Sequence, residues 1–458
     1  MERRELPNND FSIWTALKHG DVFTRLSAIV FGLGNFRHKQ IGKGIAFLLV
    51  QVSYIMYMLT FGFNSVIGFI TLGTKVQEEV FNEELQIYQY VMGDNSMLNL
   101  LYGVVTLFIT IGLIIFMIAS VKSAYFTQYT VARGNTPVTF KEDLLSLKDN
   151  KLHIALLIVP VLGVVMFTIV PLVFMIFIAF TNYDMNHLPP GKLFDWVGLE
   201  NFRALFETTG NGIAGTFLPV LIWTIVWAIF ATFTNYFLGM LLAMVINRPG
   251  TKYKGFWRFN FMLSVAVPSF VSLLAMRAIF SPNGAANVLL RELGVLAASE
   301  SFPFWTDGGV AKIMIILINI WIGVPFTMLN HTGILQNIPK ELHEAADVEG
   351  ASAFKKFTQI TFPYMLYITG PALITTFIGN INNFNVIYLL TGGGPDKIDF
   401  YYAGETDLLV TWLYKLTLTQ KDYKIGSVIG ITIFVISAVS SLIVYRRTAA
   451  YKDEEAMQ

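Results

Sequence analysis

The chain has 458 residues, of which 54% are hydrophobic and only 14% are charged. An average soluble domain carries roughly 25% charged residues, so this composition excludes a soluble single-domain enzyme and indicates a polytopic membrane protein. The net charge of +1 provides no basic field for nucleic acid, and a sequence without cysteine has neither disulfides nor thiolate metal sites.

The first element in chain order is a cytoplasmic N-terminal segment, predicted over residues 1–40. Its residues 10–40 mix charged side chains with aromatic ones such as Trp14 and Phe23. Two interpretations stay open at this point. The segment is either an interfacial amphipathic stretch that leads into the first span, or a partly ordered tail.

Eight apolar stretches follow, each long enough to cross a bilayer, which requires about 20 residues per helix. We expect them at residues 42–64, 98–121, 154–180, 217–246, 257–280, 310–333, 364–390 and 425–445. Apolar residues continue after Asn64, so the first span can extend to Leu72. The predicted fold class is therefore an all-α, polytopic membrane helical bundle with eight transmembrane helices.

The loop charges set the orientation of these spans. The first outside loop, Gly73–Met97, contains five acidic residues and the single basic residue Lys75. Most of the basic residues fall in segments 1–41, 122–153, 247–256, 334–363 and the tail. Because basic residues accumulate on the cytoplasmic side, both termini are predicted to lie inside, with a cytoplasmic linker at 122–153 and a cytoplasmic tail at 447–458.

The loop between the sixth and seventh spans has a distinctive pattern. Pro339 can open a helix, Gly350 ends it, and Ser352 can cap a second helix that runs through Thr361. Pro363 then starts the seventh span. We expect two short helices joined at a glycine elbow on the cytoplasmic face.

Glu344-Ala345-Ala346 is followed by Gly350 and then by Ile360 and Pro363. This spacing resembles the EAA loop of ABC importer permeases. The family usually has Asp before the glycine and Leu before the proline, where this chain has Glu349 and Phe362. The resemblance implies a helix that couples the permease to an ATPase subunit. The matching coupling residues are Glu344, Ala345, Ala346 and Gly350, followed by Ile360 and Pro363.

The chain contains no G-x-x-x-x-G-K-[ST] motif, because Gly44 follows Gly42-Lys43 where the motif would need Ser or Thr. The resemblance therefore implies no cofactor in this chain, with ATP and Mg²⁺ bound by partner ATPase subunits. No nucleophile or metal-ligand constellation is present either, so we expect no enzyme activity, no catalytic residue and no metal site.

A second string, Leu389-Leu390-Thr391-Gly392-Gly393-Gly394-Pro395, is similar to the larger membrane subunit of maltose/maltodextrin importers. The resemblance covers residues 150–446 well and the first 120 residues only by topology. It implies two extra helices in 41–121 before a six-helix ABC permease domain at 154–446 that includes the coupling loop 338–363. Some relatives carry a large folded insert after the third span, whereas the loop Thr181–Thr216 is short.

Polar side chains inside the predicted spans point to a sugar site. Asn380 and Asn383 are three residues apart, and Asn319, Gly323 and Phe326 follow at four and three residues, so each set is predicted to share a helix face. Amides pair with hydroxyls, and an aromatic ring stacks on the apolar face of a sugar. The alternative is that these amides join neighbouring helices.

The same resemblance places substrate contacts at eight positions. These are Ser269, Asn319, Ile322, Gly323, Phe326, Gly379, Asn380 and Asn383.

These observations predict a permease subunit of an ATP-driven ABC importer for maltose/maltodextrin or a related oligosaccharide, working by alternating access in a bacterial-type plasma membrane. The expected partners are a second homologous permease, an ATPase homodimer, an extracytoplasmic sugar-binding protein and the bilayer, with no nucleic acid. The alternative is an ion-coupled secondary sugar transporter, but that class commonly has intramembrane carboxylates and inverted repeats, which this sequence does not show.

Overall fold

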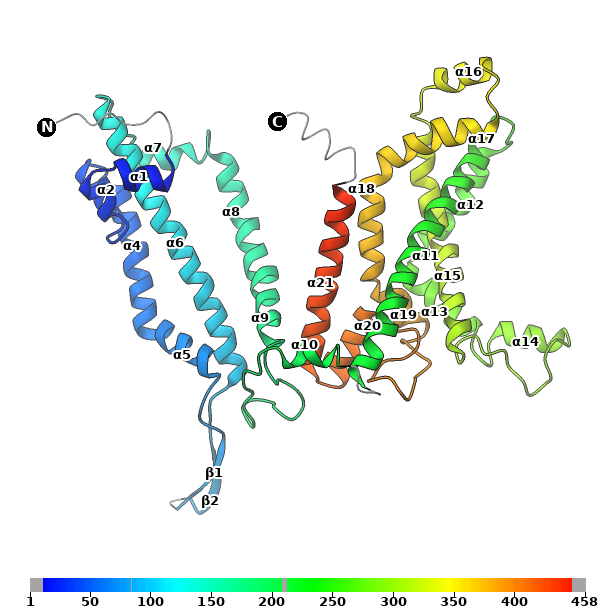
Figure 1. Cartoon of the computed structure of the whole chain (residues 1–458), viewed down its shortest axis with the longest axis horizontal. Coiled ribbons are helices and arrows are strands. Elements are labelled where there is room, and N and C mark those ends of the chain that lie inside the picture. The colour runs from blue at the N-terminus through cyan, green and yellow to red at the C-terminus, as the bar shows by residue number, and fades with distance from the viewer. Residues whose placement is uncertain (1–10, 84, 208–211, 447–458) are drawn as a thin grey trace. The chain divides into compact units, whose positions relative to one another are not determined.

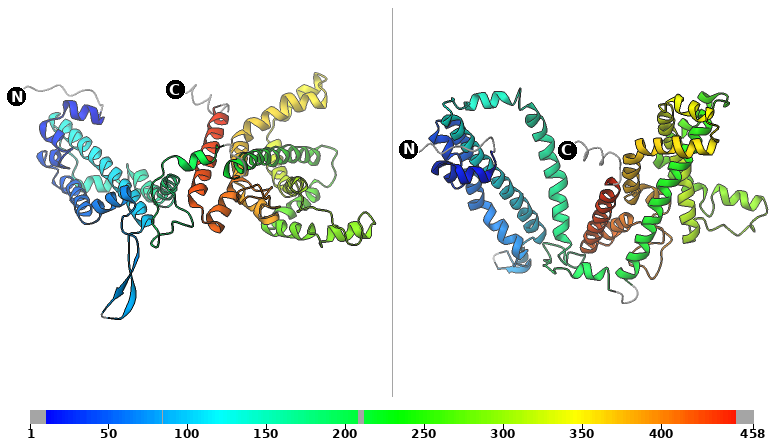
Figure 2. Two further views of the ribbon diagram at one scale, coloured as in Figure 1. Left: turned by 60° about the horizontal axis from the view of Figure 1, so that its bottom comes forward. Right: turned by 45° about the horizontal axis from the view of Figure 1, so that its top comes forward.

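The computed structural model describes residues 11–83, 85–207 and 212–446 (Figure 1). The predicted tail at 447–458 and the first ten residues of the N-terminal segment lie outside the described residues. The chain forms two compact units, residues 1–198 and 199–458 (Figure 2).

The N-terminal segment folds into three short helices, α1 (Ile13–His19), α2 (Val22–Leu26) and α3 (Leu33–Arg37). They pack on the second half of α6 (Ser96–Ala132), where Val121 and Tyr125 are buried against Ala16. The alternative of a partly ordered tail is therefore wrong for the described part of this segment.

Polar contacts fix these helices at defined places on α6. The Asp21 N–H and the Thr24 hydroxyl both donate to Oε1 of Gln128, at 2.9 and 3.0 Å. Burial acts to raise the pKa of Asp21, but the His38 ring 3.4 Å away and hydrogen bonds from Thr24 outweigh it and lower the pKa to about 2. Asp21 is thus ionised and caps α2 at neutral pH.

The first unit contains three span-length helices. The first runs without interruption from Ile41 to Thr71 through α4 (Ile41–Tyr57), the π-helical segment η1 (Met58–Gly62) and α5 (Phe63–Thr71), which confirms the longer of the two predicted lengths. The second is α6. The third is formed by α8 (Leu152–Val164), the π-helical segment η2 (Val165–Ile169) and α9 (Val170–Ile178).

The predicted linker 122–153 is largely helical. Its residues 122–132 continue α6, and α7 (Phe140–Ser146) follows with a capping box formed by Thr139 and Glu142. The apolar run of the second span ends near Val121, but helix α6 continues to Ala132. The N-terminal helices pack on this more polar part of α6 and stabilise it.

The loop between the first two spans forms an antiparallel hairpin that the all-α prediction missed. Strand β1 (Glu78–Asn82) pairs with β2 (Ile87–Val91), with Glu78 opposite Val91. The strands contain Val, Ile, Phe and Tyr, which favour extended structure. The all-α prediction is based on the apolar spans, and this loop is considered there only for its acidic charge. In Figure 1 the hairpin projects from the opposite end of α6 to α1 and α2.

The second unit begins with α10 (Glu200–Ala204) and the long helix α11 (Ile213–Asn247). The predicted fifth span is broken into α12 (Lys254–Ala266) and α13 (Ser269–Ile279), which are bent by 85° at Val267 and Pro268. The short helix α14 (Ala285–Glu292) and the sixth span α15 (Gly308–Leu335) follow.

The C-terminal part contains α16 (Lys340–Val348), α17 (Ala353–Lys356), η3 (Phe357–Thr361) and α18 (Phe362–Ile381). It continues with α19 (Phe384–Leu390), α20 (Leu409–Tyr414), η4 (Lys415–Thr419) and α21 (Tyr423–Tyr445). Across the described residues, seven helices are long and apolar enough to span a membrane, and the bent pair makes eight. The prediction of eight spans is confirmed when this pair counts as one.

Two details of the prediction are wrong. The expected second short helix of the loop is not separate, because α17 and η3 continue directly into α18 as one helix, Ala353–Ile381. The seventh span, expected at 364–390, ends at Ile381, and the chain restarts as α19. Pro363 lies inside this continuous helix, directly after the π-helical segment η3, and does not end it.

The core of the second unit lies where α11, α15 and α19 meet. Trp227, Ile315 and Ile387 are fully buried there. The indole N–H of Trp223 donates to the Thr406 carbonyl, and that of Trp227 donates to the Asn380 carbonyl, both at 3.1 Å. These two tryptophans therefore connect the loop 391–408 and the end of α18 to α11.

Candidate substrate pathway and coupling helix

Two broken helices face each other in the second unit. One break separates α12 from α13 at Val267–Pro268, the other separates α18 from α19 at Asn382–Asn383, and α13 packs against α19. A helix break inside a membrane leaves backbone polar groups without intrahelical partners, which is tolerated where the backbone is buried in protein or lines a cavity. Discontinuous helices also form the substrate sites of many transporters.

A short chain of amides surrounds the second break. Asn380 Nδ2 donates to the Thr232 hydroxyl at 2.9 Å, and Asn383 Nδ2 donates to Asn380 Oδ1 at 3.3 Å. Asn383 Oδ1 accepts the Val386 N–H at 3.2 Å and so caps α19. Asn380 and Asn383 do lie together, but the prediction that they share one helix face is wrong, because α18 ends between them.

A second polar group lies between α11 and α15. Asn319 is only 9% exposed, and within the described part of the chain its Nδ2 has no hydrogen-bond partner. The same holds for Oδ1 of Asn235 on α11. A side chain added at Gly323 would overlap with the Asn235 amide, so Gly323 allows the two helices to approach closely.

The other predicted contacts are more dispersed. Ile322 is partly buried and packs against the core of the second unit. Phe326 is 57% exposed, Ser269 is exposed as the first residue of α13, and Gly379 has open space where a side chain would point. The elements that carry all eight residues are in contact through α13, α15, α18 and α19.

Sequence reasoning missed three polar contributions from α11: Trp227, Thr232 and Asn235. A signal for two of them was present, because Thr232 and Asn235 are three residues apart and share one face of the fourth span. A hydropathy average over the fourth span does not reveal these two residues, because the surrounding residues are strongly apolar.

The loop after α19 is held by a buried ion pair that the sequence did not indicate. Asp407 is fully buried, and its Oδ2 accepts from Lys415 Nζ at 2.6 Å and from the Gly404 N–H at 2.7 Å. Burial raises the pKa of Asp407, while the Lys415 ammonium opposes this shift. The carboxylate packs directly against Gly393, where an added side chain would overlap with Oδ1.

We expect Gly393→Ala to lower the melting temperature of the purified transporter much more than Gly392→Ala. Both glycines have positive φ, +86° and +63°, so each alanine incurs about 1–2 kcal/mol of backbone strain. Only alanine at 393 also collides with the buried Asp407 carboxylate, which adds about 1–3 kcal/mol, whereas the space at 392 is open. Equal melting temperatures for the two variants would contradict this role of the buried carboxylate.

The predicted coupling helix is α16, which lies at the end of the unit opposite to α20 (Figure 1). It follows Pro339 and leaves apolar side chains exposed, with Val348 90% exposed. The chain turns at Gly350, whose φ is +73°, and Ser352 then caps α17 by accepting the Lys355 N–H at 3.3 Å. The predicted glycine elbow is therefore present.

Broken spans around an amide cluster, with a separate short helix at one end, define a polytopic membrane protein of the transporter class. Residues 235–449 match the family described as "Binding-protein-dependent transport system inner membrane component". The chain is 34% identical over 439 residues to the maltodextrin transport system permease protein MalC of Streptococcus pneumoniae, covering 94% of this chain and 96% of that protein.

It is also 35% identical over 450 residues to the galactooligosaccharides transport system permease protein GanP of Bacillus subtilis, covering 96% of this chain and all of GanP. In fold it is similar to a chain from the crystal structure of a bacterial ABC transporter involved in the import of alginate, with a TM-score of 0.54 and 22% identity, covering 66% of this chain and 97% of that chain.

The chain therefore belongs to the ABC importer permease family. It is a multi-pass inner-membrane transport subunit that works within a binding-protein-dependent ABC transporter, and it is not an enzyme. This membership excludes the alternative of an ion-coupled secondary transporter.

Proposed function

We propose that this chain is the permease subunit of an importer for a neutral oligosaccharide of the maltodextrin or galacto-oligosaccharide class. The observation that carries the proposal is similarity over nearly the whole chain to permeases named for these two kinds of sugar. Both sugars present many hydroxyls and apolar ring faces, which amides and aromatic side chains recognise.

The proposed sugar path includes the eight residues predicted from the sequence. Asn380 and Asn383 each keep one amide hydrogen beyond the bonds described above, so each can donate to a sugar hydroxyl. The unpaired Asn319 Nδ2 and Asn235 Oδ1 add a donor and an acceptor from α15 and α11. Buried polar atoms without partners are costly in a membrane protein, so their presence beside the amide cluster supports a role in binding.

We further propose the domain organisation predicted above, with a six-helix permease domain at 154–446 after two extra helices. A second homologous permease completes the pathway, and an extracytoplasmic sugar-binding protein delivers the substrate. An ATPase homodimer, which holds ATP and Mg²⁺, docks on α16. Exposed Leu342 and Val348 give this helix an apolar surface for that contact.

Uptake by proteoliposomes that contain the complete transporter and its binding protein tests the substrate proposal. Labelled maltodextrins and galacto-oligosaccharides are supplied with ATP inside, and a non-hydrolysable ATP analogue serves as the control. We expect uptake of one of the two sugars only with hydrolysable ATP. Transport of neither sugar by a complex that hydrolyses ATP would contradict the proposed substrate class.

Glu344→Ala tests the coupling helix. We expect weaker association with the ATPase, because Glu344 is exposed on α16 and is available to a cation on the partner. Glu341→Ala is the matched control, since it removes the same charge from the same helix one turn earlier. Equal co-purification of the ATPase with both variants and with the unmodified protein would argue against a role for Glu344.

A further inference from the structure

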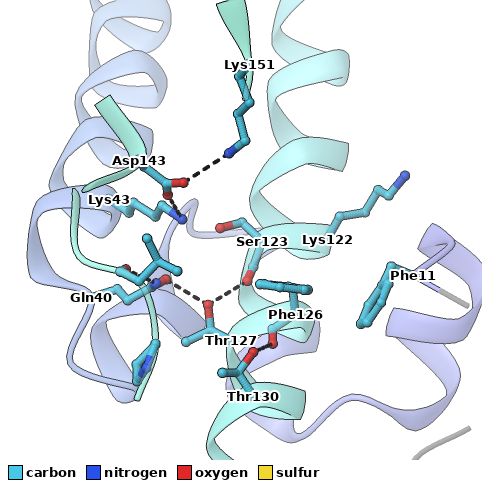
Figure 3. A pocket seen from close by; sticks show the side chains of 12 residues that line it. Phe11, Gln40, Lys43, Lys122, Ser123, Phe126, Thr127, Thr130, Asp143 and Lys151 are labelled. Atoms are coloured by element: carbon cyan, nitrogen blue, oxygen red, sulfur yellow. Dashed lines mark hydrogen bonds and ion pairs between the residues drawn. The ribbon is translucent and has the colours of Figure 1, made fainter. Parts of the chain in front are cut away.

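A pocket of about 300 Å³ lies in the first unit, among α4, α6 and the segment that leads from α6 to α8 (Figure 3). Lys43, Lys122 and Lys151 line it, together with Asp143. Nothing in the proposed sugar path or in the coupling helix uses these residues, so the pocket requires its own explanation.

The charges in this pocket do not balance. Lys43 and Lys151 both form ion pairs with the single carboxylate of Asp143, at 3.0 Å for Lys151. Lys122 on α6 is exposed and forms no ion pair with the described residues. The Lys122 side chain extends away from Asp143 along another part of the lining (Figure 3). Three ammonium groups and one carboxylate line the pocket, so these four groups carry a net charge of +2. Figure 3 shows Lys43 and Lys151 on either side of Asp143.

All three lysines lie where an apolar span meets a polar segment. Lys43 is in the first turn of α4, Lys122 directly follows the apolar run 98–121 of α6, and Lys151 directly precedes α8. Three spans thus bring one cation each to the same pocket at their predicted cytoplasmic ends. Basic pockets between transmembrane helices on this side of a membrane bind anionic lipid headgroups.

The remaining lining suits a phosphate that is attached to an apolar chain. Phe11 and Phe126 line one side of the pocket, and Phe126 is 47% exposed. The Ser123 hydroxyl accepts from Asn35 Nδ2 at 3.0 Å, which leaves its own hydrogen free to donate to a phosphate oxygen. Ammonium and hydroxyl donors thus lie beside aromatic surface, as a phospholipid at the membrane boundary requires.

We propose that this pocket binds the phosphate headgroup of an anionic phospholipid from the cytoplasmic leaflet. The lipid would bridge α4, α6 and the start of α8 and so stabilise the first unit against the membrane. A soluble phosphate compound offers the same charge, but it would not use the aromatic side of the pocket or the position at the span ends.

Binding of short-chain phosphatidylglycerol to the complete transporter in neutral detergent tests this proposal, with phosphatidylcholine as the zwitterionic comparison. We expect phosphatidylglycerol to bind more tightly, and Lys122→Gln to weaken it about fivefold, as the loss of one surface lysine does near anionic lipid. Lys122→Arg should restore the affinity. Lys141→Gln is the matched control, because Lys141 is exposed on α7 but does not line the pocket.

Equal affinity for phosphatidylcholine and phosphatidylglycerol would overturn the proposal, as would unchanged affinity in Lys122→Gln. Inorganic phosphate is the third arm of the experiment. If it displaced the lipid at concentrations similar to those of soluble phosphatidylglycerol, the site would be one for free phosphate and the lipid assignment would be wrong. Melting curves of each variant show that the protein remains folded.

Discussion

Replacement of Asn380 or Asn383 by alanine is expected to reduce oligosaccharide uptake about tenfold to a hundredfold. Each amide lies beside the break between α18 and α19 and has a hydrogen available for a sugar hydroxyl. Loss of one hydrogen-bond partner in a water-poor site costs about 1–3 kcal/mol, which corresponds to that range in affinity. Uptake of labelled oligosaccharide by proteoliposomes measures the effect.

Asn382→Ala provides the matched control for these variants. Asn382 is exposed, and its amide donates to the Ile378 carbonyl at 3.2 Å and to Ser437 at 3.5 Å, outside the chain of amides that joins Asn383 to Thr232. We expect nearly normal uptake. If Asn382→Ala alone abolished uptake while the other two variants transported normally, the proposed site would be on the wrong side of the break.

Thr232→Val separates a substrate contact from a purely structural hydrogen bond. Thr232 is 1% exposed and accepts from Asn380, so the variant removes the internal bond and keeps both amides. If the amides only hold helices together, Thr232→Val, Asn380→Ala and Asn383→Ala should all reduce assembly of the complex to a similar degree. Loss of uptake with intact assembly in the two asparagine variants alone supports sugar binding.

The sequence predicted the number of spans because apolar length alone decides which segments can cross a bilayer. It did not predict where spans break. At Pro268, a simple kink and a separation into two helices bent by 85° would have the same local sequence. The break at Asn382–Asn383 has no proline, and it depends on Asn383 capping α19 and on Trp227 binding the Asn380 carbonyl. Contacts between distant segments decide such breaks.

The candidate sugar site could be predicted only in part from the sequence, because it too depends on contacts between distant segments. Asn319, Asn380 and Asn383 stand out as amides within apolar runs, and the structure places them at or near helix breaks and close helix contacts. The role of Asn235 on α11 could not be identified from the sequence, because it depends on the contact of Asn235 with Gly323 on α15. Likewise, Asp407 is remote in sequence from the glycine it packs on, so its burial could not be read from local pattern.

Gly350→Val is expected to lower transport about tenfold while ATP hydrolysis continues without coupling to it. The end of α16 is closed by two backbone bonds, from the Gly350 N–H to the Asp347 carbonyl and from the Ala351 N–H to the Ala346 carbonyl. This closure requires the positive φ of +73° at Gly350. A side chain there costs about 1–2 kcal/mol, and a β-branched one is particularly unfavourable, so the elbow should adopt other conformations.

Gly350→Asn distinguishes the backbone requirement from a need for empty space. Asparagine tolerates positive φ, and apart from the two chain neighbours no heavy atom of the residues that the structure describes lies within 4 Å of a Cβ added at 350. If the elbow geometry alone orients α16 relative to α17 and the seventh span, Gly350→Asn should transport nearly normally and Gly350→Val should not. Transport and ATP hydrolysis are measured together in proteoliposomes. If the coupling loop depends on this elbow, a strained connection between α16 and α17 should not transmit the closure of the ATPase. Wild-type transport in Gly350→Val would therefore show that coupling does not depend on the elbow.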